Sequence, residues 1–387
     1  MNNQASSEEF NRAEQSRDVV CLSHLRWDFV YQRPQHLLSR FAKEGRVFFF
    51  EEPIFTDEAT HLEITPRTDN LFVAVPRINH SDGARSAEIQ RAMLNDLVSE
   101  RGIKNYILWF YTPSAMSFAA HLQPKITIFD CMDELSAFKF APPELLENER
   151  LLLEKADLVF TGGQSLFEAK KDKHSKVFAF PSSIDVAHFA IARTVETEPD
   201  DQREIPHPRF GFCGVIDERM DIELLGETAD LRPDWHFVMI GPVVKIAESD
   251  LPRRTNIHYL GGKKYEELPA YLASWDVALM PFALNESTEF ISPTKTPEYL
   301  AAGKPVISTA IRDVVKPYGE LGLVYIADTA EEFVAAGDKA LNENPYDRQQ
   351  KADRFLSHNS WDKTWSEMVR LIRKEIAEKP EARKQSL

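Results

Sequence analysis

The sequence has few cysteines, and none stands in a pattern that binds metal or builds a disulfide scaffold. The three that occur, Cys21, Cys131 and Cys213, are odd in number and far apart along the chain. This spacing excludes a small disulfide-stapled domain and a zinc-binding module, and isolated thiols are typical of a reducing cytoplasm. We therefore expect a cytoplasmic protein.

Long apolar runs are also missing from the sequence. No stretch reaches the roughly 18 consecutive apolar residues that a membrane-spanning helix requires. The first 17 residues are polar and acidic, whereas a signal peptide begins with basic residues and continues with an apolar core. We expect residues 1–17 to form a disordered leader.

The chain lacks an excess of positive charge. Its formal net charge is −15, divided almost evenly between a value of −8 for residues 1–200 and −7 for residues 201–387. A nucleic-acid partner is therefore not expected. One local basic run, residues 170–176, is open to two interpretations, a contact with anionic lipid or a solvated helix end.

What the sequence does contain is a regular alternation of buried strands and amphipathic helices. Apolar runs predict strands at 18–25, 46–53, 70–77, 105–113, 125–133, 156–163, 176–185, 209–216, 235–244, 256–262, 275–282, 304–309 and 322–328. Such alternation predicts parallel sheets covered by helices on both faces. No G-x-G-x-x-G follows the first strand, which disfavours a dinucleotide-dependent dehydrogenase.

The alternation is interrupted once, which divides the chain into two Rossmann-like domains. Residues 191–208 are polar and rich in proline and acids, as expected of a linker. We assign residues 18–190 to an N-terminal domain and 209–358 to a C-terminal domain. The amphipathic segment at 359–387 is expected to form a helix that packs back over the domains.

The most informative segment is residues 291–309, "ISPTKTPEYLAAGKPVIST". Ser292 or Thr294 can cap a short helix, whose free N–H groups together with Lys295 would attract an anion. Glu298, on the first or second turn, can accept hydrogen bonds from two hydroxyl groups, such as those of a ribose. The alternative interpretation is a plain capped helix with surface charges.

This segment resembles the C-terminal-domain signature of GT-B glycosyltransferases, in particular the retaining group 4 family. The signature is E-x7-E followed by Gly-x-Pro-Val-Ile, and its second Glu, which holds the nucleotide ribose, matches Glu298. The first Glu is replaced by Phe290, with Glu289 one position out of phase. The sequence of this segment is most similar to that of teichuronic-acid-type and exopolysaccharide glycosyltransferases. The resemblance implies a GT-B fold, with two sheets facing each other across a cleft.

The resemblance also implies further residues for binding the donor. Gly214 and Arg219 match the glycine and the basic residue that approach the diphosphate, and Gly241 ends a strand beside the base-binding edge. Arginine suits this task because it can bind phosphate with two parallel hydrogen bonds. An ion pair of Arg219 with Asp217 or Asp221 is the alternative.

Candidate residues of the first domain follow its predicted strands. The resemblance places a loop facing the phosphates and the acceptor where this chain has Gln32, Arg33 and His36. Asp130 and Asp133 follow the strand at 125–133, where a carboxylate can orient the acceptor hydroxyl or accept its proton. His36 can equally be a packing residue, and Asp133 can equally be a helix cap.

These matches imply transfer of a sugar from a nucleoside-diphosphate sugar, most simply UDP-linked, to a glycan or lipid-linked acceptor in cell-surface polysaccharide synthesis. The family implies retention of configuration. No D-x-D triplet occurs, so we expect a metal-independent enzyme without a cofactor, in which cationic side chains offset the leaving-group charge. Peripheral contact with the inner membrane face is left open by the sequence. Two alternatives remain open: a GT-B-fold epimerase of UDP-sugars, and an inactive relative that binds a nucleotide sugar or a glycan.

Overall fold

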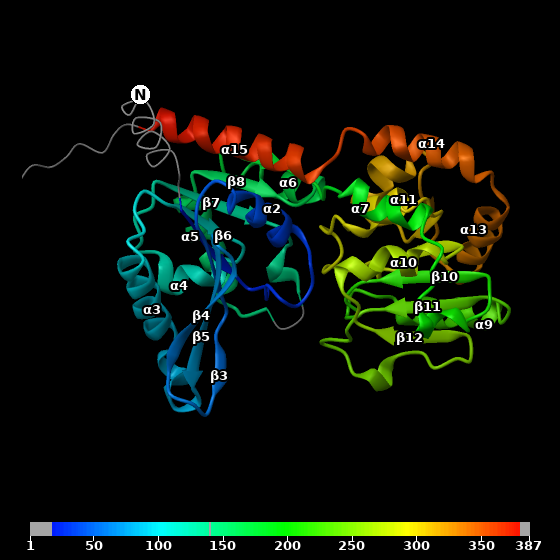
Figure 1. The fold of residues 1–387 in the computed structure, drawn as a ribbon, viewed down its shortest axis with the longest axis horizontal. Helices are drawn as coiled ribbons and strands as arrows, with labels where there is room; N and C mark the ends of the chain where they lie inside the picture. The colour runs from blue at the N-terminus through cyan, green and yellow to red at the C-terminus, as the bar shows by residue number, and fades with distance from the viewer. Residues whose placement is uncertain (1–17, 139–140, 380–387) are drawn as a thin grey trace, which may run out of the picture.

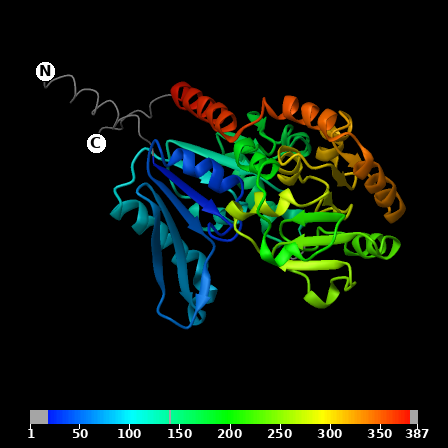
Figure 2. The ribbon, with the colours of Figure 1, turned by 45° about the vertical axis from the view of Figure 1, so that its right-hand side comes forward.

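The computed structural model describes residues 18–138 and 141–379 and shows two α/β domains side by side (Figure 1). The predicted leader at 1–17 lies outside the described residues. Figure 2 shows the same two bodies after a turn of 45°, with the last helix again over the first domain. Among the described residues, no helix is long and apolar enough to cross a membrane.

The first domain is built on a nine-stranded sheet in the order β3-β5-β2-β1-β6-β7-β8-β9, with β4 paired to β5. Its strands are β1 (Val19–Ser23), β2 (Val47–Glu51), β3 (Ile54–Thr56), β4 (His61–Thr68), β5 (Leu71–Asn79), β6 (Ile107–Phe110), β7 (Ile126–Cys131), β8 (Leu158–Thr161) and β9 (Val177–Ala179). The central strands are buried along their whole length, which explains their uniformly apolar sequences. The pairing is parallel except between β4 and β5.

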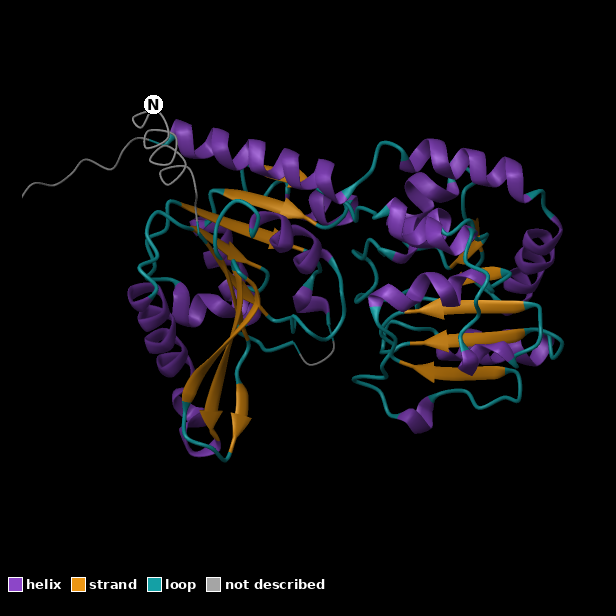
Figure 3. Ribbon diagram, viewed as in Figure 1, coloured by secondary structure: helices purple, strands orange, loops and turns teal. Residues whose placement is uncertain are grey.

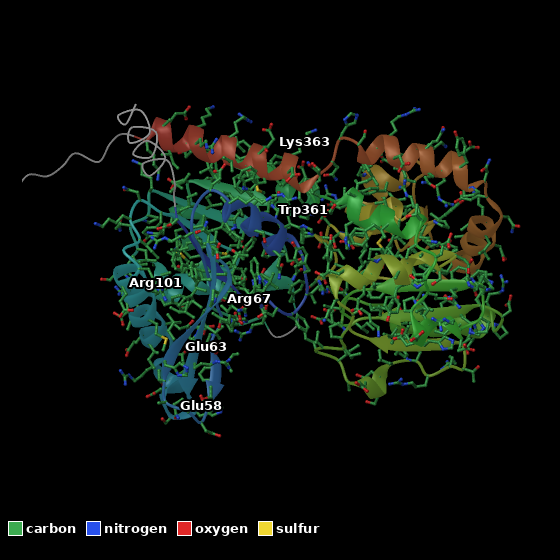
Figure 4. All side chains as sticks on the ribbon, viewed as in Figure 1. Glu58, Glu63, Arg67, Arg101, Trp361 and Lys363 are labelled. Carbon is green, nitrogen blue, oxygen red and sulfur yellow. The ribbon has the colours of Figure 1, made fainter. Side chains whose placement is uncertain are left out.

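Helices cover both faces of this sheet. They are α2 (Arg33–Phe41), α3 (Ser86–Glu100), α4 (Met116–Ala119), α5 (Leu145–Lys155), α6 (Gln164–Lys170) and the final helix α15 (Trp361–Glu378). The apolar face of α15 joins the core of the first domain through Met368, Val369 and Ile372. Figure 4 labels Trp361 at the start of this helix. The chain therefore finishes on the domain in which it began.

The strand pair β4–β5 was not fully predicted, because β4 is polar. Its residues are mostly half-buried or exposed, and the pairing with β5 is irregular beside Pro66. A proline and alternating polar residues suit an edge strand but give little sequence signal. Figure 4 shows Glu58, Glu63 and Arg67 along this projecting part of the first domain.

The second domain contains a six-stranded parallel sheet in the order β12-β11-β10-β13-β14-β15. Its strands are β10 (Arg209–Cys213), β11 (His236–Ile240), β12 (Ile257–Gly261), β13 (Val277–Met280), β14 (Val306–Ser308) and β15 (Tyr325–Ile326). Its helices, with those leading into it, are α7 (Val186–Ala190), α8 (Asp200–Arg203), α9 (Ile222–Leu231), α10 (Leu268–Ala273), α11 (Lys295–Ala301), α12 (Arg312–Val314), α13 (Ala330–Asn342) and α14 (Pro345–Leu356). Strands β10 to β12 point toward the first domain (Figure 3), so their carboxyl ends face the space between the domains.

The two domains also touch directly. The Asp313 carboxylate, in α12, accepts hydrogen bonds from the backbone N–H of Gln164 (2.8 Å) and of Ser165 (3.0 Å) in the first domain. The Ser182 hydroxyl donates to the backbone oxygen of Ser292 at 2.8 Å. These contacts join the start of α6 to α12, and the segment after β9 to the segment before α11, across the domain boundary.

Candidate active site

A cavity of about 670 Å³ lies between the two domains. The first domain contributes the segment 27–32 to its wall. The second domain contributes the ends of β10 and β11, the segment 262–266 and the start of α11. Ligands of open α/β sheets bind at the carboxyl ends of the strands, so this cavity has the position expected for a substrate.

Lys295 is the most distinctive charge in this cavity. Its ammonium lies 5.5 Å from the centre of the Phe212 ring and 5.9 Å from that of Phe282. Burial lowers its pKa, and among the described residues it forms no ion pair. A half-buried cation without a carboxylate partner is well suited to an anionic ligand.

Two glycines allow Lys295 and the strand ends to come this close. Gly214 has a φ of +150°, and a Cβ atom there would lie 2.1 Å from the Cε of Lys295. Gly241 has a φ of +145°, and its Cβ would lie 1.8 Å from the backbone oxygen of Gly214. Both the backbone angle and the space therefore require glycine at these positions.

Arg219 lies at the same edge and is held by a carboxylate. Its guanidinium binds Asp217, with a shortest N–O distance of 2.7 Å, and Asp217 is almost fully buried. Asp221 instead caps α9 by accepting a hydrogen bond from the N–H of Leu224. Arg219 lines the cavity despite its pairing, so the ion pair orients the guanidinium without removing it from the site.

Glu298 lines the cavity from the first turn of α11. Burial raises the pKa of its carboxyl to about 7, and the positive charge of Lys295 opposes this rise. The side chain of Thr294 does not cap the helix, contrary to the prediction, whereas Gly303 ends it at a φ of +78°. The helix α11 has only seven residues. We therefore attribute the attraction of the cavity for anions to the charges of Lys295 and Arg219, not to the N-terminus of this short helix.

Phe290 occupies the position where the signature has its first Glu. It packs against the apolar core of the first domain, whereas the neighbouring Glu289 is exposed. The substitution thus replaces a polar group by an apolar contact between the domains.

A smaller cavity, about 110 Å³, brings the two halves of the predicted site together. Asp133 and Gln32 line it from the first domain, and Arg219, Ser292 and Lys295 line it from the second. Burial raises the pKa of the Asp133 carboxyl, and the Arg219 charge opposes the rise. Asp133 therefore faces predicted donor residues across this smaller cavity.

Asp130 is placed differently from its predicted role. It is fully buried, and its carboxylate accepts hydrogen bonds from Arg33 Nη2 (2.8 Å) and Nε (3.1 Å). Arg33 is itself buried and also donates to the backbone oxygen of Phe180 at 2.8 Å. A carboxylate consumed by an internal ion pair cannot accept an acceptor proton, so the catalytic prediction for Asp130 does not fit this arrangement. The same pair occupies Arg33, the predicted partner of a phosphate.

His36 is also part of the core. Its ring stacks on Trp361 with centroids 4.5 Å apart, and burial lowers its pKa to about 3. A neutral, packed imidazole does not support the predicted role beside the phosphates or the acceptor. Gln32 remains at the site, since it lines both cavities.

Two functional candidates were missed by the sequence analysis. Tyr31 of the first domain stacks on Tyr265 of the second, with centroids 4.5 Å apart, and both rings line the large cavity. Lys245 has a φ of +64°, and its ammonium lies 4.8 Å from the Phe138 ring. The aromatic residues that follow the first strand were a sequence signal for the Tyr31–Tyr265 pair, whereas nothing in the sequence singled out Lys245.

The basic run at 170–176 is largely neutralised. Lys170 is fully buried and pairs with Glu134 (2.7 Å) and Glu149 (2.6 Å). Lys176 pairs with Glu375 at 2.6 Å, and Lys171 pairs with Glu168. The run therefore does not present the free positive charge that binding to anionic lipid requires.

Comparison with known proteins agrees with this geometry. Residues 207–343 match the family model described as Glycosyl transferases group 1. The chain is 24% identical, over 288 residues, to the putative teichuronic acid biosynthesis glycosyltransferase TuaH of Bacillus subtilis (strain 168). The match covers 69% of this chain and 70% of that protein.

Solved structures with the same fold cover almost the whole chain. The sucrose-phosphate synthase of Thermosynechococcus elongatus has a TM-score of 0.73 at 14% identity, covering 94% of this chain and 100% of that one. The E. coli structure titled "Trehalose-6-phosphate from E. coli bound with UDP-2-fluoro glucose" has a TM-score of 0.65 at 14% identity, covering 92% and 99%. These likenesses confirm the predicted fold class. The chain thus has the GT-B fold, and its second domain matches the glycosyl transferases group 1 model.

Proposed function

We propose that this protein transfers a glycosyl unit from a UDP-sugar to a glycan or lipid-linked acceptor in the synthesis of a cell-surface polysaccharide. One observation carries the proposal: Lys295, Arg219 and Glu298 line a single cavity at the carboxyl ends of β10 and β11. Two cations and a carboxylate at one edge match the diphosphate and the ribose of a nucleotide sugar.

In this proposal, the second domain offsets the charge that develops on the leaving diphosphate. Arg219 donates hydrogen bonds from a guanidinium already oriented by Asp217, and Lys295 adds a second positive charge. The backbone approaches closely at Gly214 and Gly241 because neither carries a side chain. These side-chain cations support a mechanism without a metal ion or other cofactor.

Glu298 is assigned to the ribose. As a carboxylate it accepts hydrogen bonds from two hydroxyl groups, which a protonated acid does less well. Asp133, on the opposite wall, is the remaining candidate for orienting the acceptor hydroxyl. Retention of configuration is proposed by analogy with the group 4 family.

The relatives support the choice of donor and pathway. The E. coli structure has UDP-2-fluoro glucose bound, and TuaH is a putative glycosyltransferase of teichuronic acid biosynthesis. We extend a UDP-sugar donor and a role in polysaccharide synthesis to this chain as part of the proposal. A cytoplasmic site of action follows from it. The comparisons favour a transferase over the epimerase and inactive-relative alternatives.

A thermal-shift screen tests the donor site directly. The parent protein is mixed with UDP, GDP, ADP and dTDP, beside the variants Arg219→Ala and Glu298→Ala. A ligand at about 100 times its dissociation constant stabilises a protein by about 2.7 kcal/mol. We expect a shift with UDP that both variants lose. The absence of a shift with every nucleotide would contradict the assignment.

A further inference from the structure

A second cavity lies wholly within the first domain. Its volume is about 320 Å³, and it is lined by the ends of β1 and β2, the residues after β6, and parts of α3 and α4. In the sheet, β2 lies on one side of β1, and β6 followed by β7 lies on the other side. The direction in which successive strands are added therefore reverses between β1 and β6. A crevice at such a switch point is a favoured place for ligands in α/β sheets.

This first-domain cavity is distinct from the cavity between the domains, because the two share no lining residue. They are nevertheless neighbours. Glu51 lines the first-domain cavity, and its carboxylate accepts a hydrogen bond at 2.8 Å from the N–H of Trp27, which lines the larger one. The segment around Trp27 thus forms the wall between the two cavities.

The apolar part of the first-domain cavity is aromatic. Phe50 and Phe118 are buried, whereas Phe55, in β3, is 43% exposed. An exposed phenyl ring at the rim of a cavity offers an apolar face to a ligand, and such faces pack against the C–H surfaces of sugar rings.

The polar part of the cavity carries negative charge and neutral hydrogen-bonding groups. The side chains of Gln90, Thr112 and Ser117 contribute an amide and two hydroxyl groups. Among the described residues that line the cavity there is no lysine, arginine or histidine. Such groups can both donate to and accept from sugar hydroxyls.

The balance of charge at the cavity opposes an anion. Arg26, which does not line the cavity, offsets Glu51 through an ion pair of 2.9 Å. The same guanidinium also donates to the backbone oxygens of Glu52 (2.6 Å) and Pro53 (3.2 Å), whereas the exposed Glu52 carboxylate forms no ion pair among the described residues. A phosphate in this cavity would meet net negative charge, which disfavours it as a ligand.

We propose that the first-domain cavity binds an uncharged, hydroxyl-bearing glycosyl unit of the acceptor and discriminates against phosphorylated sugars. This inference rests on the glycosyltransferase function proposed above. It places the acceptor in a cavity that is not lined by Arg33, His36 or Asp130. Phe55 supplies the stacking surface, and Glu52 supplies both a hydrogen-bond acceptor and the charge that repels phosphate.

The test is a glycan array that carries uncharged and phosphorylated saccharides, probed with the full-length protein. We expect the parent to retain uncharged saccharides at least tenfold more strongly than their phosphorylated counterparts. Phe55→Ala should weaken that retention about tenfold, and Glu52→Gln should reduce the discrimination against phosphate. The control is Leu146→Ala, which truncates an exposed apolar side chain on α5, away from the cavity, and should bind as the parent does.

Three results would overturn the inference: no retained uncharged saccharide, equal retention of phosphorylated ones, or unchanged retention by Phe55→Ala. A thermal shift with UDP on the same preparations separates this failure from that of the donor site. A UDP shift without glycan retention leaves the donor assignment intact and removes the first-domain cavity. If glycan retention depends on Phe55 but no nucleotide gives a thermal shift, the first-domain cavity stands and the donor assignment fails.

Discussion

The two domains differ in how their charged side chains are paired where the domains face each other. In the second domain, Lys295 and Glu298 line an open cavity, and Lys295 has no carboxylate partner among the described residues. In the first domain, Arg33 and Asp130 bind each other below the surface. The second domain therefore presents charge to a ligand, whereas the first uses much of its charge to hold its own elements together.

This difference explains which parts of the site could be predicted from the sequence. Lys295 and Glu298 were predicted from the start of one helix and Gly214 from the end of a strand, and each of these sequence signals is local. The ion pair of Asp130 was not predicted, because its partner, Arg33, is 97 positions away in the chain. An acidic residue after a strand looks the same in the sequence whether its carboxylate forms an internal ion pair or faces a ligand.

The fold was predictable for a similar reason. Buried parallel strands are apolar along their whole length, so β1, β2 and β10 have clear sequence signals. The edge strand β4 has none, since half of its surface meets solvent. The sequence predicted that the last helix packs back over the domains but not which domain α15 covers, because an amphipathic helix shows its apolar face without showing what covers it.

The largest effect that we expect lies in the first domain. Arg33→Ala leaves the Asp130 charge buried and unpaired, which should lower the free energy of unfolding by about 3–5 kcal/mol in a urea titration. A double replacement, Arg33→Met with Asp130→Leu, should recover most of this loss. If Arg33→Ala unfolds like the parent but loses transferase activity, Arg33 contacts substrate and the contrast between the domains fails.

In the second domain, the next effect comes from the backbone. Gly241→Ala adds a Cβ at a φ of +145° and against the oxygen of Gly214, which should cost about 1–3 kcal/mol of stability and disrupt nucleotide binding. Gly102→Ala is the control, because that residue also has a positive φ but no atom within 4 Å of its Cβ. Equal losses in both variants would show that the close approach at Gly241 is unimportant.

Loss of a single cation should weaken binding of the diphosphate without affecting the nucleoside. A hydrogen bond to a charged group contributes about 1.5–3 kcal/mol, so Lys295→Ala should lower UDP affinity by roughly 10- to 150-fold in calorimetry. Its affinity for uridine should stay the same. Lys316→Ala, at an exposed position away from the cavity, should leave both affinities unchanged. An equal loss for uridine would remove Lys295 from the phosphate site.

The smallest expected effect depends on pH. The pKa of Glu298 is raised to about 7, so the side chain is protonated in part of the protein at neutral pH. Binding of a ribose favours the ionised form, and uridine affinity should therefore rise with pH up to about 7 and level off above it. The gain is at most about tenfold per pH unit. Uridine carries no phosphate that titrates in this range.

The control for this pH profile is Glu298→Gln, which keeps the shape of the side chain but cannot ionise. Its uridine affinity should be low and flat between pH 6 and 8. A rise of the same size in this variant would assign the titration to another group.

The central claim is that the second domain holds the nucleotide, and hydrogen exchange with and without UDP tests it most directly. We predict slower exchange of backbone amides at 214–220 and 292–299, and unchanged exchange at 112–118 in the first-domain cavity. Protection confined to the first domain would contradict the account.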